Sequence, residues 1–271
     1  MFGWFRRRRR KKILATPFPE TWNEIIRTNV LHDRHLTEQQ RQRLRQYVQI
    51  FVAEKNWEGC RGLQMTDEIK VTIAGLAGLM VLEVGTDINF DHVLSILVYP
   101  DSYVAKDVEI TRAGIVLERG QARLGEAWWR GPVILSWRDV LAGGRREAAG
   151  QNLVFHEFAH QLDMLNGRDV DGIPPLQTRQ QLQRWLEVMA PEYQRHARDC
   201  RQGRRGVIDC YGATSDAEFF AVVTEAFFEN PRQLALHHSQ IYELLRDYFG
   251  LDPAAWSDSE HVKDQNASKN L

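Results

Sequence analysis

The stretch Val154–Asp163, with the sequence VFHEFAHQLD, places His156 and His160 four residues apart and Glu157 directly after the first histidine. On an α-helix, positions four apart lie on one face with Cβ atoms about 5–6 Å from each other, so both imidazoles can reach one ion. A glutamate in this position can act on a metal-bound water without ligating the metal, as in the H-E-x-x-H zinc hydrolases. The alternative is an ordinary amphipathic helix that contains polar residues. A third ligand further along the chain would favour the zinc site.

Two glutamates qualify as the third ligand, Glu218 and Glu225, both in the segment DAEFFAVVTEAFFE. They are seven residues apart, which is two helical turns to within about 20°, so they share one helix face and periodicity does not separate them. Four other residues are weaker candidates: Asp209, His196, His237 and His238. The last two follow a helix-starting proline, and we expect them to be surface residues.

The composition predicts a globular chain of 271 residues, 43% of them hydrophobic, with enough length to bury a substantial core. The three cysteines, Cys60, Cys200 and Cys210, include no Cys-x-x-Cys pair. They therefore suggest neither a thiolate zinc site nor a disulfide framework, and a reducing compartment fits best.

The charge of the chain is unevenly distributed. Arg6 to Arg10 are followed by Lys11 and Lys12, so that a net charge of −1 leaves the remainder of the chain acidic. We expect residues 1–15 to form a flexible basic arm. A contact with an anionic membrane or a nucleic acid through Phe2, Trp4 and Phe5 is the alternative. Nucleic-acid binding is not expected, because the acidic body offers no matching basic face.

The N-terminal part, residues 16–90, is expected to be helical. Thr37 and Gln40 form the pattern of a capping box and predict a helix from about residue 37 to 55. Thr66 opens a second helix over the apolar run 71–84, which is shorter than the roughly 20 residues that cross a bilayer. We expect these two helices to pack together, and no segment is expected to be transmembrane.

Residues 91–256 are expected to hold a small sheet and the helices of the site. Runs rich in β-branched residues predict strands at 93–99, 114–117 and 133–137. Helices are predicted over the opening motif, over 177–200, over 215–229 and after Pro231. The polar residues 257–271 are expected to be a flexible tail. The fold class predicted is α+β, mostly helical with a small mixed sheet in one domain over residues 16–256.

The segment YGATSDAEFFA, Tyr211 to Ala221, placed after HEFAHQLD, resembles the catalytic domain of anthrax lethal factor and the Mlc titration factor A family of bacterial metallopeptidases. In that pattern a tyrosine precedes the ligand glutamate by seven residues, which matches Tyr211 and Glu218. The stretch GEAWWRGPVILSW over residues 125–137 also resembles the titration-factor family. The likeness to that family runs from about Pro19 to Trp256, whereas the likeness to lethal factor is confined to the site.

The resemblance implies a zincin-like fold with one Zn²⁺ per chain, held by His156, His160 and Glu218. Three protein ligands leave a position for water, whose proton Glu157 can accept. Tyr211 can donate to the developing oxyanion. Three roles remain open for Glu225. It can support the ligands from behind, it can be purely structural, or it can be the ligand in place of Glu218. Asp163 can orient a ligand or the following loop, or can make a plain helix-end or loop hydrogen bond.

The resemblance also implies an aminopeptidase-like activity on peptides, in the cytoplasm. It implies binding to the transcriptional repressor Mlc, and thereby control of the glucose phosphotransferase system. The strand over 133–137 is expected either to lie at the edge of the sheet over the site helix, where a peptide can pair with it, or to be core sheet. Trp128, Trp129 and Trp137 either shape the cleft or pack in the core. The alternative function is a non-catalytic regulatory binding protein with a vestigial zinc site, against which the intact Glu157 argues.

Overall fold

The computed structural model describes residues 2–85, 88–101, 104–105, 108–110, 116–118, 131–146, 150–167 and 170–256. The chain is mostly helical, as predicted. The N-terminal half contains, in order, α1 (Phe2–Leu14), α2 (Glu20–Asn29), η1 (Leu31–His35), α3 (Glu38–Glu54), β1 (Asn56–Gly59), α4 (Asp67–Val81), β2 (Ser95–Tyr99), β3 (Val104–Ala105), β4 (Val108–Ile110) and β5 (Val116–Glu118). The C-terminal half contains β6 (Val133–Ser136), α6 (Trp137–Gly144), α7 (Leu153–Asp163), η2 (Met164–Asn166), α8 (Arg179–Arg201), η3 (Cys210–Ala213), α9 (Asp216–Glu229), α10 (Pro231–His237), α11 (Ser239–Phe249) and η4 (Pro253–Ala255).

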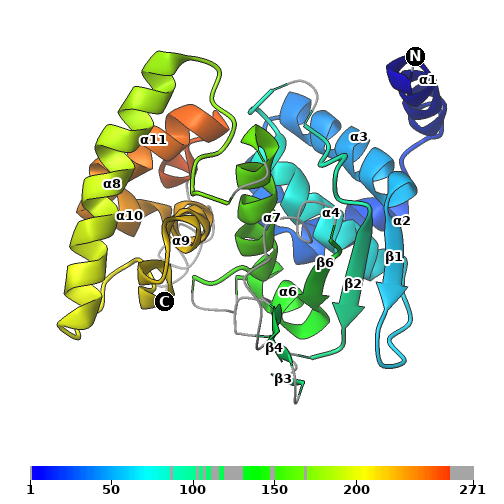
Figure 1. Ribbon diagram of the computed structural model, residues 1–271. Helices are drawn as coiled ribbons and strands as arrows, with labels where there is room; N and C mark the ends of the chain where they lie inside the picture. The colour runs from blue at the N-terminus through cyan, green and yellow to red at the C-terminus, as the bar shows by residue number, and fades with distance from the viewer. Residues whose placement is uncertain are drawn as a thin grey trace, which may run out of the picture.

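The helix α7 lies in the middle of the molecule, with the sheet and α2–α4 on one side and α8–α11 on the other (Figure 1). Its two phenylalanines hold it there. Phe158 packs against Phe51 of α3 and against Phe90, with ring centroids 5.8 and 4.9 Å apart. Phe155 stacks on Phe228 of α9 at 4.6 Å. The histidines of α7 are thus carried by a helix that is fixed from both sides.

The N-terminal helices form as predicted. The Thr37 side chain accepts the Gln40 N–H at 3.3 Å, and the Gln40 side chain accepts the Thr37 N–H at 3.0 Å, which completes the capping box of α3. Thr66 caps α4 by accepting the Ile69 N–H. The helices α3 and α4 pack together, and α4 is buried along almost its whole length. No helix among the described residues is both long and apolar enough to cross a membrane.

The sheet differs from the mixed sheet that the sequence predicted. Strands β1, β2 and β6 form a parallel sheet in that order, with Ile96 of β2 opposite Trp57 and Val133. Strands β3, β4 and β5 form a separate antiparallel sheet. The strand β1 has the sequence NWEG, which lacks a run of β-branched residues, so only pairing with β2 makes it a strand. The expected strand at 114–117 lies partly outside the described residues.

The expected end positions of several elements also change. The strand at 133–137 ends one residue early, because Ser136 caps α6 and Trp137 begins that helix. The single helix expected after Pro231 is two helices, α10 and α11, separated at His238, whose φ of −140° is not helical. The expected tail over 257–271 lies outside the described residues.

The segment expected as a flexible arm contains the helix α1. Its Arg10 guanidinium pairs with Glu54 of α3 at 2.6 Å and also with Asp91, and Arg6 pairs with Asp91. These carboxylates belong to the acidic remainder of the chain. Ion pairs therefore hold the segment that was expected to be flexible. The pairs bring α1 beside α3 at the edge of the molecule (Figure 1).

A disulfide joins Cys200 at the end of α8 to Cys210 at the start of η3. The cysteine pattern predicted no disulfide framework, and this prediction was wrong. The two cysteines are ten residues apart, without a recognisable motif, and they meet because the chain turns back after α8. Cys60 is free.

Candidate metal centre

The helices α7 and α9 bring His156, His160 and Glu218 together. The Asn152 side chain caps α7 by accepting the Phe155 N–H at 3.2 Å, and the Ser215 side chain caps α9 by accepting the Glu218 N–H at 3.2 Å. The Nε2 atoms of His156 and His160 lie 3.1 and 3.5 Å from Oε2 of Glu218. One ligand atom from each residue lies within 4.8 Å of those from the other two.

The ligand atoms are buried and lack hydrogen bonds. His156 and His160 are 2% and 5% exposed. Their Nε2 atoms and Oε2 of Glu218 have no hydrogen-bond partner among the described residues. Buried polar groups in native proteins are nearly always hydrogen-bonded, so three buried atoms that contact one another without hydrogen-bond geometry, and have no other partner among the described residues, need an explanation. Imidazole nitrogens and a carboxylate oxygen are ligands of Zn²⁺, and these three residues fit such an ion.

The weaker candidates lie elsewhere. His196 contacts the backbone carbonyl of Asp209 at 3.1 Å, and the Asp209 side chain accepts the Tyr211 N–H at 2.9 Å. His238 lies 3.2 Å from Glu192, and His237 is exposed. None of these four belongs to a metal-ligand cluster among the described residues.

Glu157 lies inside the same buried region. It is 6% exposed, and its Oε1 has no hydrogen-bond partner in the described part of the chain. Burial raises the pKa of Glu157 to about 8, although His156 acts in the opposite direction. The carboxyl group can therefore exchange a proton near neutral pH, which a general base requires.

Tyr211 lies beside the cluster. Its ring centroid is 5.9 Å from that of His156. The half-buried ring packs against the hydrophobic core, and η3 positions it through the hydrogen bond from the Tyr211 N–H to Asp209. The structure thus places Tyr211 next to the first histidine.

Residues 4–250 match the family described as glucose-regulated metallo-peptidase M90. The chain belongs to this family. An uncharacterized protein of Synechocystis sp. is 39% identical over 246 residues, which cover 90% of this chain and 89% of that protein. A protein named Mlc titration factor A from Serratia proteamaculans is 33% identical, with 86% and 88% covered, and one from Klebsiella pneumoniae is 30% identical, with 90% and 91% covered.

In this M90 protein Glu225 lies behind the cluster, on the other nitrogen of His156. Its Oε1 lies 2.8 Å from His156 Nδ1, and its Oε2 accepts the Asn152 N–H at 2.7 Å. A carboxylate on Nδ1 holds the proton there and leaves Nε2 free to bind a metal. Burial opposes protonation of the imidazole, but Glu218 and Glu225 together raise the pKa of His156 to about 10, so a metal ion would displace the proton on Nε2 when it binds.

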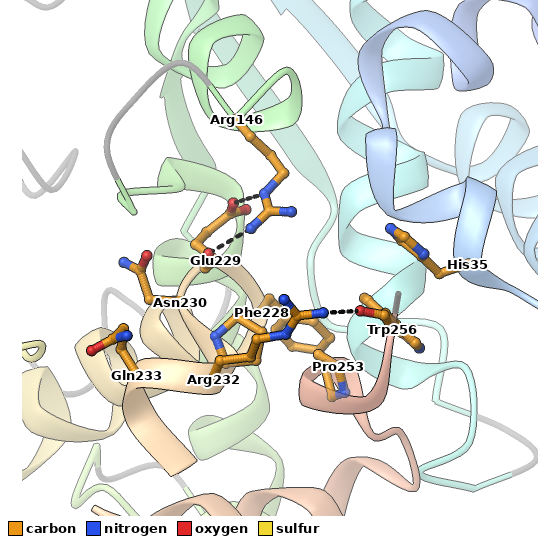
Figure 2. A pocket seen from close by; sticks show the side chains of 10 residues that line it. His35, Arg146, Phe228, Glu229, Asn230, Arg232, Gln233, Pro253 and Trp256 are labelled. Carbon is orange, nitrogen blue, oxygen red and sulfur yellow. Dashed lines mark hydrogen bonds and ion pairs between the residues drawn. The ribbon is translucent and has the colours of Figure 1, made fainter. Parts of the chain in front are cut away.

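A second buried carboxylate, Glu229, continues this support one turn further along α9. Asn152 Nδ2 donates to Glu229 Oε1 at 2.9 Å, and Arg146 Nη2 donates to the Glu229 carbonyl at 2.7 Å. Figure 2 shows Arg146 reaching down to Glu229 beside a cavity of about 150 Å³, with His35 and Trp256 on its far side. Burial raises the pKa of Glu229 to about 7 against the opposing effects of Asn152 and Arg146. The sequence analysis missed Asn152 and Glu229, although the capping position before the motif and the four-residue spacing from Glu225 were available signals.

Asp163 fixes the loop after the site helix. Its two oxygens accept the N–H groups of Gly172 at 2.7 Å and Ile173 at 3.1 Å. Trp185 of α8 in turn donates its indole N–H to the Gly172 carbonyl at 3.0 Å. Asp163 thus makes loop hydrogen bonds, which hold Gly172 and Ile173 at the end of α7.

The strand β6 lies at one end of the parallel sheet and contacts α7, so the edge position predicted for it is observed among the described strands. Trp137 packs partly against the core from the first position of α6. Trp128 and Trp129 lie outside the described residues.

Proposed function

We propose that the protein is a zinc-dependent peptidase with its catalytic centre at His156, His160, Glu218 and Glu157. The observation that carries this proposal is the set of buried ligand atoms without hydrogen bonds beside a glutamate that is equally buried. A purely structural metal site would not need a buried glutamate such as Glu157 beside its ligands. The family supports the same chemistry, since it is a family of metallopeptidases.

His156, His160 and Glu218 would hold the ion, which supplies a Lewis acid and lowers the pKa of a water molecule when bound. Glu157 would accept the proton of the attacking water and return it to the leaving amine. Tyr211 would donate a hydrogen bond to the oxygen that becomes negatively charged. Glu225 would keep His156 in the tautomer that binds the ion.

An extended peptide is the proposed substrate. The position of β6 at the end of the parallel sheet among the described strands, beside α7, supports this, because an added strand can form backbone hydrogen bonds at such an edge. We further propose aminopeptidase action in the cytoplasm. No carboxylate that would bind a free amino terminus stands out from the site.

Binding of the repressor Mlc, and with it an effect on the glucose phosphotransferase system, is a second proposed role. Relatives that carry the name Mlc titration factor A match most of the chain and support it. A purely regulatory protein would need the binding surface but not Glu157. The two roles can also coexist.

Metal analysis combined with hydrolysis of amino-acyl chromogenic substrates tests the catalytic proposal. We expect about one zinc ion per chain in the wild type and in Glu157→Ala, with cleavage only in the wild type. Glu243→Ala, which removes an exposed glutamate of α11, is the matched control and should cleave normally. Zinc without cleavage in the wild type would contradict the peptidase, and capture of purified Mlc by the same protein would then favour the regulatory role.

A further inference from the structure

A groove of about 600 Å³ lies between α1 and the pair α3–α4. Apolar side chains that line it include Leu14, Ile50, Val81, Leu82 and Ile88, and we call these its apolar floor. Its rim carries the cations Arg7, Arg10, Lys11 and Arg43. A groove of this kind suits a ligand with an apolar chain and an anionic head group.

Two of the rim cations have no carboxylate partner in the part of the chain that the structure describes. Arg43 pairs with Glu83 at 2.6 Å and Arg10 with Glu54 at 2.6 Å. Within the described residues, no carboxylate pairs with Arg7 or Lys11. These two charges lie on one face of α1, four residues apart, and remain available to an anion.

Tyr47 provides an independent sign of a ligand in the groove. This residue lines the groove and is 8% exposed, and its hydroxyl is buried without a hydrogen-bond partner in the described chain. The ring reaches this position because Gly78 faces it from α4, where a Cβ atom would lie 2.7 Å from the ring. An unpaired buried hydroxyl destabilises the folded protein, and a ligand oxygen would satisfy it.

The outer surface of α1 indicates where such a ligand resides. Trp4 and Phe5 are each 60% exposed, on a helix without acidic residues in its first turn and with seven cations in succession. Aromatic side chains next to lysines and arginines are typical of segments that lie on anionic membranes. A single free lipid in the groove would leave Trp4 and Phe5 in solvent, whereas a bilayer surface would cover them.

We propose that the groove and α1 bind an anionic phospholipid of a membrane surface, with Arg7 and Lys11 at the phosphate, the acyl chain on the apolar floor, and Tyr47 bonded to a lipid oxygen. The helix α1 lies at the edge of the molecule, apart from α7 and α9 (Figure 1). The candidate metal centre would therefore stay accessible on the docked protein. The proposal does not depend on peptidase activity.

The test is co-sedimentation of the full-length protein with vesicles of phosphatidylcholine, alone or containing phosphatidylglycerol. We expect binding only with phosphatidylglycerol, weakened at least about tenfold by Arg7→Glu/Lys11→Glu. The matched control is Arg8→Glu/Lys12→Glu, which makes the same charge change on the same helix at positions outside the groove. It should weaken binding clearly less. All variants should keep the wild-type melting temperature and zinc content.

Tyr47→Phe isolates the groove from the general charge of α1. Loss of one hydrogen bond should weaken vesicle binding about three- to tenfold. The melting temperature should not fall, because the hydroxyl has no partner to lose. Unchanged vesicle binding by Tyr47→Phe would overturn the assignment of the groove.

Three other outcomes would overturn the proposal. Equal losses in the two double variants would show that only the net charge of α1 matters. Heparin binding that depends on Arg7 and Lys11 as strongly as vesicle binding does would indicate a general polyanion site. Binding of monomeric oleate without binding of vesicles would indicate a carrier for free lipid.

Discussion

The two ends of the His156 imidazole face opposite kinds of surroundings. On the Nε2 side, the ligand atoms of the cluster are buried and lack hydrogen bonds. On the Nδ1 side, Glu225, Asn152, Glu229 and Arg146 are joined by a continuous set of hydrogen bonds. These four residues behind the site are thus hydrogen-bonded to one another, whereas the three ligand atoms in front of it contact each other without hydrogen-bond geometry, which indicates that the front is built for a ligand.

Replacing a residue of the front should have the largest effect on metal binding. Glu218→Ala removes one of three ligands, so we expect zinc affinity to fall by more than about 100-fold, beyond the range typical of residues behind the ligands. Titration against a fluorescent chelator measures this. Saturating zinc should also stabilise the wild type against urea, by about 2.7 kcal/mol at 100 times Kd, and should not stabilise the variant. Unchanged affinity would remove Glu218 from the ligand set.

Replacing Glu225 should have a smaller effect on the same quantity. Glu225→Gln keeps a hydrogen-bond acceptor for His156 but loses the charge, so we expect a loss of roughly 10- to 100-fold in zinc affinity. Glu218 and Glu225 are separated by seven residues on α9, so the pair compares a ligand with a supporting residue on one helix. A loss as large as that of Glu218→Ala would break the distinction between front and back.

The buried Glu229, which lies behind the site, should make the free energy of unfolding depend on pH. Its pKa is raised from 4.5 to about 7, so the folded state holds the proton more tightly than the unfolded state. The stabilisation is complete below pH 4.5 and is lost as the pH rises to about 7, with a change of about 3 kcal/mol. Urea unfolding of the wild type and Glu229→Gln across this range measures the difference. If the two proteins show parallel pH dependence, Glu229 does not titrate as described.

Much of the front could be predicted from the sequence, because its signals are local. The spacing of His156, Glu157 and His160 places the three on one helix, and a family pattern was needed to choose Glu218 over Glu225. In the structure Glu218, rather than Glu225, lies in the candidate cluster with the two histidines. Ser215 caps α9 by accepting the Glu218 N–H, which places Glu218 in the first turn of that helix. Glu225 lies two turns further along, on the Nδ1 side of His156.

Features that depend on long-range pairing were missed. The strand β1 exists through its pairing with β2, and α1 is held by carboxylates more than forty residues away in the chain. The disulfide between Cys200 and Cys210 requires the turn after α8. None of these has a periodic or spacing signal in its own residues, so the sequence alone did not predict them.

The smallest expected effect on zinc affinity concerns Asn152, which joins the front and the back of the site. Asn152 caps α7, and its backbone and side chain contact Glu225 and Glu229. Asn152→Ala should lower the free energy of unfolding by about 2 kcal/mol, because it removes both the cap and the hydrogen bond to the buried Glu229 side chain. Asn152→Ser, which keeps a capping oxygen, should recover part of this loss. The backbone N–H still binds Glu225 in both variants, so zinc affinity should change little, and a large drop would show that the cap and the metal centre are coupled through the register of α7.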